Sequence, residues 1–474
     1  MLIREAELPG GAIADLRVAA GRIAEIAPRL ARLGGDEPLV EAQGGALLPG
    51  LHDHHLHLYA LAAALDSLPC GPPQVRDAEA LRGQLRARAS ELAPGEWLRG
   101  VGYHESVAGE LDREALDALL PSVPLRIQQR SGRLWLLNSA ALAEIESANG
   151  DDPLERVDGR ATGRLYDADD WLRGRLPRRP LSLARASRLL ASYGVTGVTD
   201  TTPQNDLAAA EGFAAAQARG ELLQNLLLMG DASLDALPDR PGLSRGARKF
   251  HLHDHELPDF EALCADIRAS HRAGRATAFH CVSRTDLVFA LGALREAGVL
   301  AGDRIEHASV LPPELLEEVA ALRLTVVTQP HFIAERGDAY LREVAAEDRP
   351  WLYRLRGLLD AGIPLAAGSD APFGEADPWQ AMRAAIRRET REGQVMAAGE
   401  ALSASQALAL FTGAPAAPGG PPRPVAPGVA ADLCLLDRSW RALVDANLES
   451  PRVRLSLRAG QPIHSADAVL AGSA

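Results

Sequence analysis

A turn followed by a dense group of histidines is the feature of this sequence best suited to chemistry. Four histidines fall within six residues of the run Leu48-Pro-Gly-Leu-His-Asp-His-His-Leu-His57. Imidazole is the commonest side-chain ligand for transition metals in proteins. Side chains two positions apart on a strand point to the same face, so His55 and His57 can hold one metal ion together. The alternative, a histidine-rich surface turn, would not explain why similar residues recur further along the chain.

Residues that could bind a metal also lie at or near the ends of four further short apolar runs: Lys249, His280, His307 and Asp370. Such runs, separated by helical stretches, predict buried parallel strands. In a (β/α)₈ barrel the carboxyl ends of the strands form one face, and active sites lie there. These residues would therefore converge with the first histidine pair, which predicts a metal centre.

The predicted organisation is a barrel with two additions. The length and the strand–helix alternation of the centre predict an α/β fold, a (β/α)₈ TIM barrel over residues 49–423. Residues 1–48 and 424–474 contain short strands broken by glycines, so we expect one small β-sandwich domain built from both termini. A stretch of about 66–180 predicts an inserted lid subdomain. It contains Leu125-Arg-Ile-Gln-Gln129, a ninth candidate strand for eight barrel places.

The composition narrows the class of protein. Hydrophobic residues make up 47% of the 474 residues and charged residues 24%, which is typical of soluble globular proteins. The net charge of −13 argues against a nucleic-acid partner, which would favour a basic patch. The four cysteines form no Cys-x-x-Cys pair, so we expect no disulfide framework. The start of the chain is not typical of a signal peptide, and no stretch approaches membrane-spanning length, so we expect a cytoplasmic protein without a membrane partner.

These motifs together resemble those of the metal-dependent amidohydrolase superfamily and, within it, the amidohydrolase-3 (YtcJ-like) branch. The segments 49–58, 304–308 and 368–372 are similar to the first, sixth and eighth barrel strands of that branch. Asp377-Pro-Trp-Gln-Ala-Met and Leu402-Ser-Ala-Ser-Gln resemble its closing helices. The resemblance spans nearly the whole chain. It is specific for the branch and only weakly specific for the substrate.

The resemblance implies a binuclear site with these ligands: His55, His57 and Asp370 for one divalent ion, His280 and His307 for the other, and carboxylated Lys249 as the bridge. A free ammonium has no lone pair to donate, whereas a carbamate has two anionic oxygens. We expect two zinc ions per subunit, and manganese, iron or nickel would fit the same ligands. The metals would lower the pKa of a bridging water, and Asp370, the expected catalytic residue, would carry the proton to the leaving nitrogen.

The expected reaction is hydrolysis of a non-peptide C–N bond in a small-molecule substrate, such as an amide, an N-substituted formamide or a cyclic amide. An ester or lactone would suit the same site, because hydroxide attack on a polarised carbonyl is common to both. Two other hypotheses stay open: a catalytically silent binding protein, and a mononuclear enzyme in which Lys249 is not carboxylated. A homodimer is plausible from the base rate of oligomers alone.

Two groups of histidines stand apart from this ligand set. His52 and His54 form a second pair, which strand alternation places on the opposite face from His55, so we expect them to pack or to support the site. The run after Lys249 departs from the branch's usual Lys-x-x-x-Asp-Gly and contains three histidines: His251, His253 and His255. They share the face of Lys249 if the strand runs on, and they could contact substrate, replace a ligand, or belong to a polar loop. His253 is our substrate-binding candidate among them.

Two further residues are candidates for binding substrate. Arg133 follows a glycine at a place where many relatives have a histidine. Its guanidinium would suit a carboxylate, and a surface arginine is the alternative. His331 follows the predicted seventh barrel strand, where it would line the pocket or lie in a loop.

Overall fold

The computed structural model describes residues 1–72, 74–93, 95–146, 152–176, 181–238, 240–449 and 451–466. The chain divides into two compact units. One consists of Met1–Leu58 together with Leu183–Ala474, and the other of Tyr59–Ser182.

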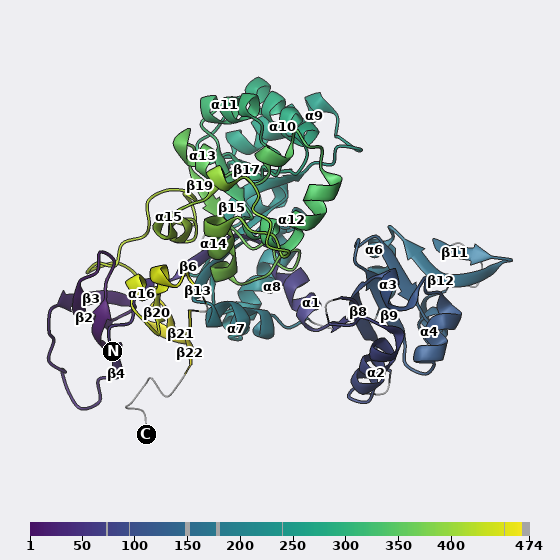
Figure 1. Ribbon diagram of the computed structural model, residues 1–474, viewed down its shortest axis with the longest axis horizontal. Helices are drawn as coiled ribbons and strands as arrows, with labels where there is room; N and C mark the ends of the chain where they lie inside the picture. Colours follow the sequence, from purple (N-terminus) through teal and green to yellow (C-terminus); the bar gives the residue numbers. More distant parts are fainter. Residues whose placement is uncertain are drawn as a thin grey trace. The chain divides into compact units, whose positions relative to one another are not determined.

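An eight-stranded parallel sheet forms the centre of the first unit (Figure 1). Its strands pair in this order: β6 (Leu51–Leu56), β13 (Val195–Asp200), β14 (Asn225–Gly230), β15 (Leu243–His251), β16 (Thr277–Cys281), β17 (Arg304–His307), β18 (Thr325–Thr328) and β19 (Leu365–Ala367). The segment after β19 closes on β6, because the Asp370 N–H donates to the His55 carbonyl (2.7 Å) and the His57 N–H to the Ala371 carbonyl (2.9 Å). The predicted TIM-like barrel is confirmed as a nearly closed one.

Helices follow the barrel strands: α1 (Leu58–Leu65), α7 (Ala184–Ser192), α8 (Leu207–Ala218), α9 (Phe260–Arg272), α10 (Arg284–Ala297), α11 (Pro313–Ala321), α12 (His331–Glu343), α13 (Arg356–Asp360), α14 (Pro378–Arg387) and α15 (Ala404–Ala409). Side-chain caps set the starts of several of these helices. Asp259 accepts the Ala262 N–H before α9, and Ser283 forms a capping box with Asp286 before α10. No helix among the described residues is long and apolar enough to cross a membrane.

Two small sheets from the chain ends form the predicted β-sandwich. One has the order β3 (Arg22–Ala27), β2 (Ile13–Ala19), β1 (Leu2–Glu7) and β4 (Leu39–Glu41). The other has the order β22 (Gln461–Ser465), β21 (Val453–Arg458), β20 (Leu433–Leu436) and β5 (Leu47–Pro49). Side chains of both sheets share one core, to which Ile3, Leu16, Leu433 and Leu455 contribute. The purple and yellow ends of the chain therefore lie side by side (Figure 1).

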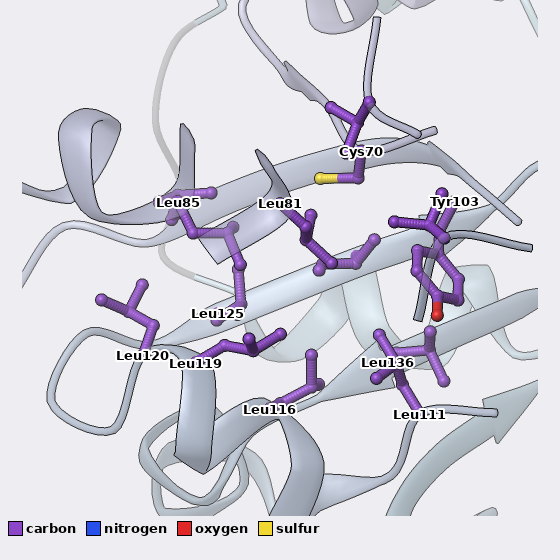
Figure 2. Packing of buried hydrophobic residues seen from close by; sticks show 14 of the residues in the cluster. Cys70, Leu81, Leu85, Tyr103, Leu111, Leu116, Leu119, Leu120, Leu125 and Leu136 are labelled. Carbon is purple, nitrogen blue, oxygen red and sulfur yellow. The ribbon is translucent and has the colours of Figure 1, made fainter. Parts of the chain in front are cut away.

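The second unit has a sheet of its own, in the order β11 (Leu154–Val157), β12 (Arg160–Tyr166), β10 (Leu134–Leu137), β9 (Leu125–Gln129), β8 (Leu98–Tyr103) and β7 (Leu68–Pro69). Its helices are α2 (Ala78–Ala89), α3 (Glu105–Ala108), α4 (Arg113–Leu119), α5 (Ser139–Ile145) and α6 (Asp169–Arg175). Figure 2 shows its core, in which Leu81, Leu85, Leu116 and Leu125 pack together. The ninth candidate strand is β9 of this sheet, so it is not part of the barrel.

All four cysteines are free and buried in the structure.

Candidate metal centre

The site begins where the last barrel strand meets the first. Asp370 Oδ1 lies 3.4 Å from His55 Nε2 and 3.3 Å from His57 Nε2. One ligand atom from each of the three residues lies within 4.8 Å of the others, so together they can hold one metal ion. Gly368 permits this approach, because a Cβ there would lie 2.3 Å from the backbone nitrogen of His55. Asp370 itself has a left-handed backbone (φ 53°), a strained conformation that often marks functional sites.

In three histidines the ring nitrogen Nδ1, called the far nitrogen below, is occupied by a hydrogen bond. The bonds join His55 Nδ1 with Glu306 Oε2 (2.6 Å), His57 Nδ1 with Thr202 Oγ1 (2.9 Å) and His307 Nδ1 with Gln329 Oε1 (2.7 Å). Each bond leaves Nε2 of its imidazole free for another partner. Metal-binding histidines almost always use their second nitrogen in this way, which fixes the tautomer and the ring orientation. The hydrogen bonds therefore suit these imidazoles to metal binding.

The other predicted ligands lie next to this group. The His307 ring packs on those of His55 and His280, with centroids 4.7 and 4.5 Å apart. Lys249 Nζ lies 3.9 Å from Glu306 Oε1. Both Lys249 Nζ and His307 Nε2 are buried without a hydrogen-bond partner among the described residues. Orphaned buried polar atoms are rare and costly. Metal ions bound by His307 and by a carboxylated Lys249 would satisfy both, so the residues present fit the expected metals.

Burial and neighbouring charges put these groups in forms that bind metal. Burial would raise the pKa of Asp370, but its contacts with His55 and His57 hold it well below its ordinary value. Burial, aided by nearby His55, lowers the pKa of His307 to about 3. Burial also lowers the pKa of Lys249 to about 8, against the attraction of Glu306. Near neutral pH the carboxylate is therefore ionised and the His307 imidazole neutral, as ligands must be.

The amidohydrolase family matches residues 39–464 of the chain. The chain belongs to the amidohydrolase family. The N-substituted formamide deformylase of Arthrobacter pascens is 26% identical to it over 486 residues, covering 89% of each chain. The YtcJ protein of Bacillus subtilis strain 168 is also 26% identical, over 79% of this chain and 80% of its own. The resemblance inferred from the sequence motifs is thus confirmed.

A solved structure shows the same fold. The crystal structure of an uncharacterized metal-dependent hydrolase from Pyrococcus horikoshii OT3 has a TM-score of 0.76 with this amidohydrolase-family chain. The match covers 98% of this chain and 99% of the other, at 20% sequence identity.

Three residues of the centre were missed by the sequence analysis: Thr202, Glu306 and Gln329. Each lies at or just beyond the carboxyl end of a barrel strand. This position in the sequence could have marked them as candidates for the site. Asp53 was missed too. Its Oδ1 accepts the N–H of His55 (3.1 Å) and that of Ser369 (3.0 Å). A second unused signal concerns Lys249, which is the only lysine in the sequence.

His52 and His54 lie outside the ligand group. Their rings pack together at 4.5 Å, and His52 Nε2 bonds to Thr199 Oγ1 at 2.9 Å. These contacts agree with the first of the two expected roles, packing, and the supporting role stays a prediction. However, the pairing of β6 with β13 shifts register between Asp53 and Leu56, so strict alternation is interrupted there.

The substrate-binding candidates have different surroundings. His253 is exposed beyond the end of β15, and its ring centroid lies 6.4 Å from that of His280. His331 is the buried first residue of α12, and its Nε2 donates to the Ser369 carbonyl (2.9 Å) beside Asp370. Arg133 belongs to the second unit, and its side chain already makes two hydrogen bonds to Asp167 (2.8 and 2.6 Å).

Proposed function

We propose that this protein is a metal-dependent hydrolase that cleaves a non-peptide C–N bond in a small amide, N-substituted formamide or cyclic amide. The observation that carries the proposal is the approach of Asp370 to His55 and His57, within 3.4 Å of both Nε2 atoms, beside two orphaned buried atoms. The similarity to a formamide deformylase makes N-substituted formamides the first substrates to test.

In this proposal the ligands have separate tasks. His55, His57 and Asp370 would hold one ion, His280 and His307 would hold the other, and Lys249, once carboxylated, would serve as a ligand shared by both. When bound, two zinc ions would supply hydroxide near neutral pH and polarise the carbonyl. Asp370 takes the proton of the attacking water and delivers it to the leaving nitrogen, because its carboxylate is ionised and close to both histidines.

The three substrate-binding candidates would contribute in unequal ways. We propose that His253 contacts substrate directly, since it is exposed and near His280. We propose that His331 acts on Asp370 through the Ser369 carbonyl, because its Nε2 is already occupied there. Arg133 would need to leave Asp167 before binding an anionic group.

Metal content and turnover test the proposal. Tag-free protein, purified without chelator, is analysed for metal and assayed for amine release from a panel of N-substituted formamides, with formate esters alongside. We expect two equivalents of metal and activity lost with chelator. His57→Ala should lose both, whereas His104→Ala, in the second unit, should keep both. One equivalent would favour the mononuclear enzyme, and no metal uptake with no turnover would overturn the proposal.

The single lysine allows a separate test of the bridge. Metal-loaded protein is incubated with ¹³C-bicarbonate, and the carbamate region of its ¹³C spectrum is compared with that of Lys249→Met. We expect one side-chain carbamate signal in the native chain and none in the variant. Two bound metals without this signal would contradict the carboxylated bridge but leave hydrolysis standing.

A further inference from the structure

A row of five imidazoles runs from the proposed centre toward the surface, in this order: His307, His280, His251, His253 and His255. Successive ring centroids are 4.5, 4.1, 4.2 and 5.5 Å apart. The first two rings belong to the proposed binuclear centre. The other three follow Lys249 on the same segment of chain, and all three are exposed.

The ring nitrogens of His251 and His253 are not used in hydrogen bonds between described residues. Neither imidazole makes a hydrogen bond within the described part of the chain, and His255 contacts Asp254 at 3.4 Å. A backbone turn, closed by the Glu256 N–H and the His253 carbonyl (2.9 Å), folds the segment just beyond the strand. Two neighbouring exposed imidazoles therefore have free nitrogens, and the third imidazole of the segment contacts a carboxylate.

We infer that this segment binds a further divalent transition-metal ion, with His251 and His253 as the main ligands. Imidazole selects zinc and similar ions over calcium and magnesium, which prefer oxygen. The acidic residues Asp254, Glu256 and Asp259 in the same segment favour a cation over an anion. The site lies next to the proposed binuclear centre, since the His251 and His280 ring centroids are 4.1 Å apart, but it shares no proposed ligand with it. His253, proposed above to contact substrate, would do so in the absence of this further ion.

The affinity should be lower than that of the proposed centre. Among the described residues, the set whose ligand atoms already lie within 4.8 Å of one another is His55, His57 and Asp370. The segment 251–255 must adjust its side chains and use water to complete the coordination. Ordering exposed side chains costs free energy, so we expect zinc to bind here at least tenfold more weakly.

Zinc titration of the tag-free holoenzyme tests the inference. Bound zinc per chain is measured by equilibrium dialysis in zinc-buffered solutions, and cobalt replaces zinc in a second titration to follow ligand-field absorption. The test variant is H253A/H255A, which keeps every ligand of the proposed centre. The matched control is H104A/H464A, which removes two imidazoles outside the row.

We expect the native chain and the control to bind two ions tightly and a third more weakly, and H253A/H255A to lose the third alone. A native chain that saturates at two ions, or a test variant that still binds three, overturns the inference and leaves the proposed function intact. A weak ion without the two tight ones, lost in H253A/H255A, would support the inference while contradicting the binuclear centre.

Discussion

Strand β6 carries two pairs of histidines, and the pairs have opposite surroundings. His55 and His57 bond through Nδ1 to Glu306 and Thr202, and their Nε2 atoms approach Asp370. His52 bonds to Thr199, and neither nitrogen of His54 has a partner among the described residues. One pair is therefore prepared for metal, whereas the other is packed against itself.

The charges around the two pairs explain the difference. Burial lowers the pKa of His55, but Glu306 and Asp370 more than restore it, so that it lies above its ordinary value. Burial lowers the pKa of His54 well below its ordinary value, and the cations Arg304 and Arg423 lower it further. A metal cation would be attracted to the first pair and repelled from the second. Along β6, imidazoles are therefore suited to metal binding where a carboxylate lies nearby and Nδ1 is hydrogen-bonded.

Removing the carboxylate charge beside the first pair should have the largest effect. In Asp370→Asn the amide can no longer accept the proton, so we expect turnover to fall by about 10³-fold while metal stays bound. Steady-state kinetics with elemental analysis measure this. Full activity in the variant would exclude Asp370 as the proton carrier.

Weakening the bond to the far nitrogen of His55 should have the next largest effect. Glu306→Gln keeps the shape but removes the negative charge facing His55 Nδ1, so zinc affinity should fall by roughly 10–100-fold. Competition with a chromophoric chelator measures it. Thr202→Val, which removes a neutral bond to His57, serves as the matched comparison and should lose less. Equal losses would mean that charge is not what distinguishes the first pair.

The second pair, His52 and His54, should make the free energy of unfolding depend on pH. The folded-state pKa of His54 is far below its ordinary value of 6.5, so its contribution to stability is present above pH 6.5 and is lost as pH falls. In His54→Leu the pH slope of the unfolding free energy below pH 6.5 should be smaller by about 1.4 kcal/mol per pH unit. Urea unfolding of the metal-free chains between pH 7.5 and roughly pH 5 measures it. Identical slopes would show that His54 is not buried in its neutral form.

The smallest effect is expected for the same variant at neutral pH. Removing a buried imidazole without partners costs little, so His54→Leu should keep its unfolding free energy at pH 7.5 within about 1 kcal/mol. Its turnover should stay within about twofold, as His54 is outside the ligand group. A large loss of activity with unchanged stability would mean that the second pair does support the site.

Most of the barrel could be predicted from local patterns in the sequence. Buried parallel strands appear as short apolar runs, and the residue ending a run is placed at the barrel face by the fold itself. This is why Lys249, His280 and His307 could be brought together without coordinates. Strand β9 could be assigned outside the barrel because nine candidates competed for eight places.

Contacts between distant segments were harder to predict. The bond between Glu306 and His55 joins residues 251 positions apart, and its existence depends on the register of the whole barrel. The pairing of Arg133 with Asp167 depends in the same way on the antiparallel pairing of β10 with β12. Strict alternation also failed along β6, because a register shift there is not visible in the residue pattern.

The contact between the first barrel strand and the segment after the last one has a consequence for the synthesis of the protein. Asp53 bonds to the Ser369 N–H, a residue 316 positions later, and Asp370 follows directly. A ribosome would release His55 and His57 long before the carboxylate that completes their set. During synthesis His55 and His57 would therefore be present before Asp370 is available. Metal captured at that stage would be held by an incomplete set of ligands. Loading of the finished site would then report that the nascent chain has closed its barrel.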